Sequence, residues 1–152
     1  MQEIQLLASQ SPSNTLVNEV YLPEVKAAIA LAQHRPETVA QLLASSVSYA
    51  LSSKVPQLQG IASIENKNPQ QAVSDFQPGI RYRGVSLQEG GNGTGQSPDY
   101  ALCLLGTARA QAQVDKTAAL KSYQKLMDLW KNADSDFIPA QEARAEMTVL
   151  NR

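Results

Sequence analysis

The sequence predicts an all-α fold, an antiparallel stack of helix pairs (an α-solenoid) with a capping helix at its C-terminal end. Alanine-rich amphipathic stretches come in pairs joined by short polar turns, at residues 33–37, 66–70 and 113–116. Pro36 and Pro69 of the first two turns lie 33 residues apart, which indicates a repeated unit. Hydrophobic residues make up 43% of the chain and aromatic ones only 5%, which suits closely packed helices rich in alanine and leucine.

The composition excludes several classes of protein. The 13 basic and 14 acidic residues nearly cancel, and no basic block stands out, so the chain lacks the electrostatic pattern of a nucleic-acid binder. No apolar run approaches the roughly 18 residues that span a bilayer, so we expect no membrane insertion of this segment. Residues 1–4 lack the positive charge of a signal peptide. The single cysteine, Cys103, cannot form an internal disulfide and does not indicate a compartment.

We expect one repeat domain over residues 1–152. Residues 1–10 look like the end of a helix, and residues 11–14 break it. The first unit covers residues 17–50, with its second helix at 36–50. Apolar residues recur at helical spacing in the first helix, at Val20, Ala27, Ala28, Leu31 and Ala32, and in the second, at Val39, Leu42, Leu43 and Val47. Pro23 is tolerated as a first-turn residue.

The second unit covers residues 55–83. The inner face of its first helix is formed by Leu58, Ile61, Ala62 and Ile64, and that of its second by Ala72, Val73 and Phe76. Gly60 would let a neighbouring helix approach closely. Pro78-Gly79 interrupts the second helix, because proline removes a backbone hydrogen bond and clashes with the preceding turn. We therefore expect a kink or an early stop near Gln77.

Residues 84–96 are rich in glycine and predict a flexible linker. The third unit covers residues 97–131, with Ser97 as helix cap and Pro98 as the first helical residue. Residues 138–150 form the capping helix. The inner positions are Leu102, Leu105, Ala108 and Ala112, then Ala119, Tyr123, Leu126 and Trp130, and in the cap Ala143, Met147 and Leu150.

Three groups of residues have the composition of possible chemical sites. Residues 90–97 fit the spacing of a phosphate-binding loop, but Gln96 replaces the required lysine, so a linker is favoured over a nucleotide site. Asp134, Asp136 and Glu142 could suggest a metal site, but Asp134 and Asp136 precede a helix, so we expect them to cap it and to interact favourably with its dipole. Cys103 lies among leucines and favours a buried position over pairing with His34. We expect no catalytic residue, no cofactor and no metal site.

Three stretches resemble a known family. These are residues 16–31, then 104–110 with 119–126, and most specifically 129–136 running into 142–146. Together they resemble the C-terminal tetratricopeptide (TPR)-like repeat region of bacterial eukaryotic-like serine/threonine protein kinases, and the 33-residue spacing is close to the roughly 34-residue TPR period. The resemblance implies a TPR-like superhelix.

The same resemblance bears on location and activity. In such kinases a cytoplasmic kinase domain precedes a membrane segment and then the repeats, so it implies the extracytoplasmic side of a membrane-anchored protein. A free-standing chain would be cytoplasmic. The chain has no His-Arg-Asp loop and no Asp-Phe-Gly segment, so we expect no enzymatic activity from it. Three features depart from the family pattern, namely Pro78-Gly79, the glycine-rich insertion at 90–95, and Val114 in place of a turn glycine.

The expected function is therefore protein interaction or regulation without catalysis. A peptide or partner helix would lie across the first helices of the pairs, on polar positions outside the apolar stripe. These candidate surface residues are Lys26, Gln33, Gln59, Arg109 and Gln113. Two alternatives remain open. The first is a spacer or oligomerisation module that forms a homodimer through an open N-terminal edge. The second is a nucleotide-binding domain that uses residues 90–97.

Overall fold

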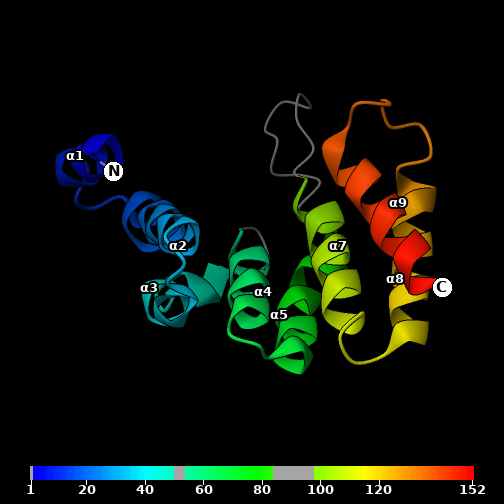
Figure 1. Ribbon diagram of the computed structural model, residues 1–152. Helices are drawn as coiled ribbons and strands as arrows, with labels where there is room; N and C mark the ends of the chain where they lie inside the picture. Colours follow the sequence, from blue (N-terminus) through cyan, green and yellow to red (C-terminus); the bar gives the residue numbers. More distant parts are fainter. Residues whose placement is uncertain (1, 50–53, 84–97) are drawn as a thin grey trace.

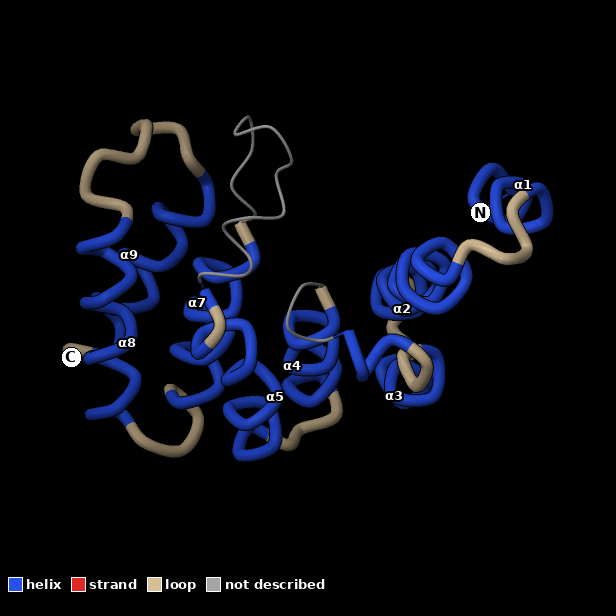
Figure 2. Tube along the Cα trace, turned by 180° about the vertical axis from the view of Figure 1, so that it is seen from behind, coloured by secondary structure: helices blue, strands red, loops and turns tan. Residues whose placement is uncertain are grey.

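The computed structural model describes residues 2–49, 54–83 and 98–152, and all regular secondary structure in these ranges is helical, as predicted (Figure 1). The helices follow one another in chain order from α1 at one end of the molecule to α8 and α9 at the other (Figures 1 and 2). The elements are α1 (Gln2–Gln10), the π-helical segment η1 (Leu16–Tyr21), α2 (Leu22–Ala32), the 3₁₀ segments η2 (Pro36–Thr38) and η3 (Ser46–Tyr49), α3 (Val39–Leu42), α4 (Val55–Glu65), α5 (Pro69–Arg81), α7 (Asp99–Gln111), α8 (Lys116–Leu129) and α9 (Ile138–Leu150).

The structure repeats itself with the spacing seen in the sequence. Helices α2 and α4 are each 11 residues long, and both their first and their last residues are 33 positions apart. Pro23 and Pro56 occupy the same place in the first turn of each helix, a position where proline is common. The sequence repeat therefore covers a whole helix and not only the turn that follows it.

The turns after α2 and α4 share one backbone geometry. His34 and Lys67, also 33 positions apart, are in the left-handed region with φ of 54° and 60°. The next residue in each turn donates a backbone hydrogen bond five positions back, from Arg35 to Ala30 at 2.9 Å and from Asn68 to Ser63 at 2.9 Å. This is the Schellman motif that commonly ends a helix.

The third turn is built differently, and Val114 gives the reason. A β-branched residue disfavours positive φ, and in the part of the chain that is described only His34 and Lys67 among the non-glycines have it. Instead the Asp115 N–H donates to the Gln111 carbonyl at 2.7 Å. The Asp115 carboxylate then caps α8 by accepting from the Ala118 N–H at 2.9 Å.

The ring of Phe76 occupies the centre of the second and third pairs. It is fully buried on α5, and α5 packs against both α4 and α7. A Cβ atom added to Gly60 of α4 or to Gly106 of α7 would overlap this ring. The predicted close approach at Gly60 is confirmed, and Gly106 provides the same space from the other side.

The second segment of each pair buries two residues four positions apart, and the later of the two is the larger. On α5 and α8 the small residue is alanine and the larger one is aromatic, which fills the space between neighbouring pairs. The three couples are Val39 with Leu43, Ala72 with Phe76, and Ala119 with Tyr123, all at most 1% exposed. The buried residues around them form three clusters, which are linked by the partly buried Ile61 and Ile80.

The prediction of one helix over residues 36–50 is wrong. The described part of this segment consists of η2, the four-residue α3 and η3, and Val47 is 51% exposed instead of facing the core. The hydroxyl groups of Ser45 and Ser46 donate to the Glu19 carbonyl of η1, at 3.0 Å and 2.7 Å. These contacts compete with regular helix geometry, because serine can bond backbone groups outside the helix ladder.

Of the two outcomes expected near Gln77, a kink or an early stop, the early stop is wrong. Helix α5 continues through Pro78 and Gly79 to Arg81, and the Pro78 carbonyl accepts from the Tyr82 N–H at 3.0 Å. A Cβ on Gly79 would stand 2.5 Å from Cys103 Sγ, so α5 and α7 touch closely where the helix was expected to end. Packing against α7 outweighs the lost hydrogen bond of proline.

The first residues of α7 and α9 agree with prediction to within one residue. Helix α7 begins at Asp99, one residue after the predicted Pro98, and α9 begins at Ile138 with Ala143 buried. The predicted linker at 84–96 and the Ser97 cap lie outside the described residues. Among the described helices, none is both long and apolar enough to cross a membrane.

Candidate functional site

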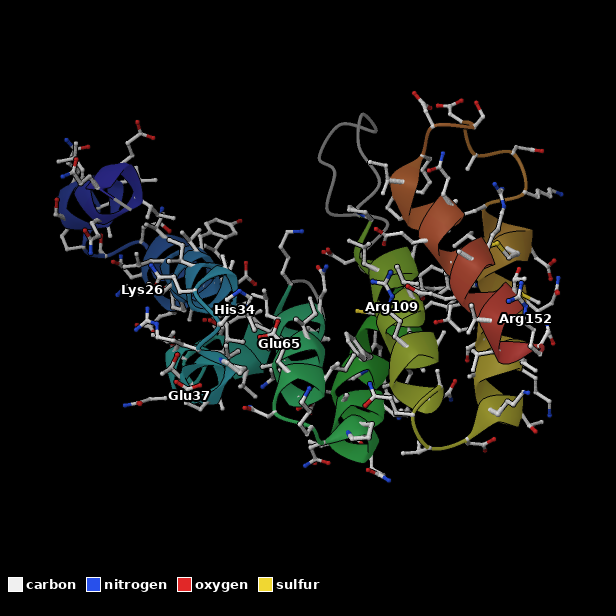
Figure 3. All side chains as sticks on the ribbon, in the orientation of Figure 1. Lys26, His34, Glu37, Glu65, Arg109 and Arg152 are labelled. Carbon is white, nitrogen blue, oxygen red and sulfur yellow. The ribbon has the colours of Figure 1, made fainter. Side chains whose placement is uncertain are left out.

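A groove between α4 and α7 has an apolar floor and a polar rim. Its volume is about 230 Å³. We call it the α4–α7 groove. Its floor is formed by Ile61, Ile64, Phe76, Leu102, Leu105 and Gly106, and its rim by Gln57, Glu65 and Arg109. Figure 3 labels Glu65 and Arg109 on the two helices that bound it.

A second groove lies between α7 and α9, and we call it the α7–α9 groove. Its volume is about 440 Å³, and it is almost wholly apolar apart from two charged side chains. It is lined by Arg109, Ala112, Tyr123, Ala145, Glu146, Val149 and Leu150. Arg109 lines both grooves, so they adjoin on the face where α4, α7 and α9 follow one another.

Arg109 is held in place by carboxylates from α9. Its Nη2 donates to Glu146 Oε1 at 2.7 Å and to Glu142 Oε2 at 2.8 Å, and its Nε donates to Glu146 Oε1 at 3.0 Å. The hydrogen bond to Glu146 raises the pKa of Arg109 further above its ordinary value. The guanidinium therefore fixes α9 against α7 and is a positioned rim group.

Tyr123 extends this cluster to α8. Its hydroxyl donates to Glu146 Oε2 at 2.7 Å, while the ring is 1% exposed. Burial, reinforced by the bond to Glu146, raises the pKa of Tyr123 well above its ordinary value. One carboxylate thus connects α7, α8 and α9 and holds together the walls of the α7–α9 groove.

Cys103 is buried, and its thiol is a weak nucleophile. It packs with Ala72 and Phe76, whereas His34 is exposed in the first turn, so the structure does not bring the thiol and the imidazole together as a pair. Burial, followed by the negative charge of Asp99, raises the pKa of Cys103 to about 12. The nucleophilic thiolate is therefore suppressed at neutral pH.

We expect alkaline pH to destabilise the fold through Cys103. The pKa of the thiol is about 12 in the folded chain against an ordinary 9.0, so the unfolded chain loses the proton first and stability falls as pH rises from 9.0 toward 12. The free energy of unfolding of the wild type, measured relative to Cys103→Ala by urea denaturation, should decrease across this range. A difference that does not change with pH would contradict a buried, protonated thiol.

The five predicted surface residues lie in different places. Lys26 and Gln33 line a third groove of about 710 Å³, the α2–α3 groove, together with Pro23, Ile29, Arg35, Thr38, Gln41 and Leu42. Arg109 lines the other two grooves. Gln59 is half-buried and Gln113 is exposed after α7, and neither lines any of these three grooves.

Sequence reasoning missed the two polar rim residues of α4. Gln57 and Glu65 share a helical face with Ile61 and Ile64, because positions four and seven or eight apart lie above one another on a helix. The sequence alone shows this spacing on α4. It does not show which face of α7 lies opposite, because that depends on how α7 packs beside α4.

The acidic residues before α9 do not cap it. The cap residue of α9 is Phe137 and no side chain caps it, so the capping role expected for Asp134 and Asp136 is wrong. Glu142 instead binds Arg109. Within residues 2–49, 54–83 and 98–152, no group of three or more histidine, cysteine, aspartate or glutamate residues could hold a metal ion. The glycine-rich segment 90–97 lies outside the described residues.

No protein-family model matches the chain, and neither a curated protein nor a solved structure matches it. The resemblance to the repeat region of serine/threonine kinases therefore stays a prediction from the sequence.

Proposed function

We propose that the chain is a non-catalytic protein-interaction module of the TPR-like helical-repeat class. In this proposal the face formed by α4, α7 and α9 binds a peptide segment of a partner protein. The observation that carries it is the pair of apolar grooves that adjoin at Arg109. The 33-residue repeat of α2 and α4, with its repeated Schellman turn, supports the repeat class.

The lining of the grooves indicates the chemistry of the peptide. The floor of the α4–α7 groove is made of aliphatic side chains and Phe76, so it would accept an apolar anchor residue. Around it lie the guanidinium of Arg109, the carboxylates of Glu142 and Glu146 that bind it, and, on the α4 side, the carboxylate of Glu65. This excess of negative charge favours a peptide with lysine or arginine beside its apolar anchor.

The kinase resemblance suggests the kind of protein in which this module would act. If the chain is the C-terminal region of a serine/threonine kinase, peptide binding would be regulatory, because no kinase motif lies within these 152 residues. The reading frame upstream of the Met1 codon tests this directly. A frame that continues into a kinase domain and a hydrophobic span would support it, and a stop codon would restrict the link to ancestry.

We expect Gln57→Trp to block the α4–α7 groove without unfolding the chain. Gln57 is half-buried on the rim, and an indole there would lie over the apolar floor. Peptides would be selected on the wild type from a displayed random library and titrated by fluorescence anisotropy. Their affinity for Gln57→Trp should be at least about tenfold lower, as expected when an anchor residue loses its pocket.

Gln77→Trp is the matched control. Gln77 is exposed on α5 and lines none of the three grooves, so the same substitution there should leave affinity and melting temperature unchanged. The proposal fails if no peptide is selected above background, or if the selected peptides bind Gln57→Trp as tightly as they bind the wild type.

A further inference from the structure

The internal repeat identifies a helix face on α2 that lacks the cover its counterpart has. On α4, Val55, Leu58 and Ala62 are buried in the cluster that joins the first and second pairs. The residues 33 positions earlier are Leu22, Val25 and Ile29, and each is only half-buried. Since repeat units bury this face against a neighbouring element, the α2 face has the form of a docking surface.

The α2–α3 groove shares Ile29 with this face and is basic. Ile29 and Leu42 contribute its apolar surface, and Lys26 and Arg35 contribute positive charge. No acidic residue lines it, and neither cation forms an ion pair with the residues that the structure describes. Figure 3 shows Lys26 on the side of α2 away from α4. The groove therefore fits an apolar helix that carries negative charge.

Helix α1 presents such a surface at the same end of the molecule. Glu3, Leu6, Leu7 and Gln10 are exposed and lie at positions i, i+3, i+4 and i+7, so they form one stripe. The two leucines are 57% and 47% exposed, while Ala8 on the opposite side of α1 is buried. Glu3 is the only charged residue of α1.

We propose that two copies of the chain associate through their N-terminal ends. Each copy places the α1 stripe, with Leu6 and Leu7, against the α2–α3 groove of the other. Glu3 then approaches Lys26 and Arg35. Because the stripe and the groove lie at one end of the chain, a two-fold axis satisfies both contacts and closes the assembly, as in most homo-oligomers. The α4–α7 and α7–α9 grooves stay free.

Charge reversal with mixing tests this dimer by sedimentation velocity, from low micromolar to several hundred micromolar protein. The wild type should reach twice the 16.4 kDa mass of one chain. Glu3→Lys alone, and Lys26→Glu with Arg35→Glu in a second variant, should each weaken dimerisation at least about tenfold, because like charges then face each other. An equimolar mixture of the two variants should restore the dimer, since each stripe meets a groove of opposite charge.

Lys121→Glu with Lys125→Glu, two exposed lysines on α8 at the other end, is the matched control and should sediment as the wild type does. Circular dichroism checks that every variant is folded. A wild type that stays monomeric throughout the range overturns the proposal. So does a dimer that neither reversal weakens, or a mixture of the two variants that remains monomeric.

Discussion

Replacing Phe76 by alanine should lower the free energy of unfolding by about 3–5 kcal/mol, the usual cost of removing a large aromatic side chain from a core. Phe76 is fully buried where α4, α5 and α7 meet. Gly60 and Gly106 flank the ring and have no side chains that could move into the space left behind. The cavity should therefore remain largely open, which places the loss toward the upper part of this range.

Urea denaturation followed by circular dichroism measures this loss. Phe137→Ala is the matched control, because Phe137 is 37% exposed and contacts Trp130 edge-on at 5.2 Å between ring centroids. Its loss should be about 1 kcal/mol. If Phe76→Ala is too unstable for a reliable baseline, Phe76→Leu should give a smaller loss of the same origin. Equal losses for Phe76→Ala and Phe137→Ala would contradict the central position of Phe76.

Gly106→Ala should destabilise the chain by about 1–3 kcal/mol, although alanine is the better helix former. In an exposed helix this change stabilises by roughly 1 kcal/mol. Here the added Cβ would overlap the Phe76 ring inside a packed core. Overpacking of this kind destabilises the chain by more than the higher helix propensity of alanine stabilises it. Equilibrium urea unfolding of Gly106→Ala and of the wild type shows directly whether the free energy of unfolding falls or rises. Gly60→Ala should behave in the same way.

A double-mutant cycle tests whether the destabilisation by Gly106→Ala comes from overlap with the Phe76 ring. Combining Gly106→Ala with Phe76→Leu should cost less than the sum of the two single changes, because the smaller side chain leaves room for the new methyl group. If the two costs simply add, or if Gly106→Ala stabilises the chain, then α7 does not approach α5 as closely as the structure indicates.

The regular parts of the fold could be predicted because local patterns determine them. Alanine-rich amphipathic stretches and polar turns identify the helix pairs, and the Pro36–Pro69 spacing identifies the repeat. The role of Gly60 could also be inferred, since a glycine on the inner face of a helix allows a neighbouring helix to approach closely. Gly106 has the same role but was overlooked among its leucine and alanine neighbours.

The failures come from contacts between residues far apart in the chain. Nothing near Ser45 and Ser46 indicates that their hydroxyl groups bind the carbonyl of Glu19 and break the second helix. The continuation of α5 beyond Gln77 depends on Gly79 touching Cys103 of α7. Propensity favoured the opposite outcome in each case, and tertiary packing decided it.

The candidate site was predicted only in part for the same reason. Arg109 was identified as a polar surface residue, but its carboxylate partners are 33 and 37 positions later and could not be assigned from spacing. On α4 the sequence pointed to Gln59, whereas Gln57 lines the groove. Which polar face of α4 borders the groove is set by the position of α7 beside it, and no local pattern contains that information.

Isoleucine-methyl NMR tests most directly whether the α4–α7 groove binds peptide. Ile61 and Ile64 lie in that groove, while Ile29 lies in the α2–α3 groove and Ile138 is exposed at the start of α9. During titration with a peptide selected on the wild type, the methyl resonances of Ile61 and Ile64 should shift and those of Ile29 and Ile138 should not. Shifts confined to Ile29 or Ile138 would place the binding surface elsewhere and contradict the proposed function.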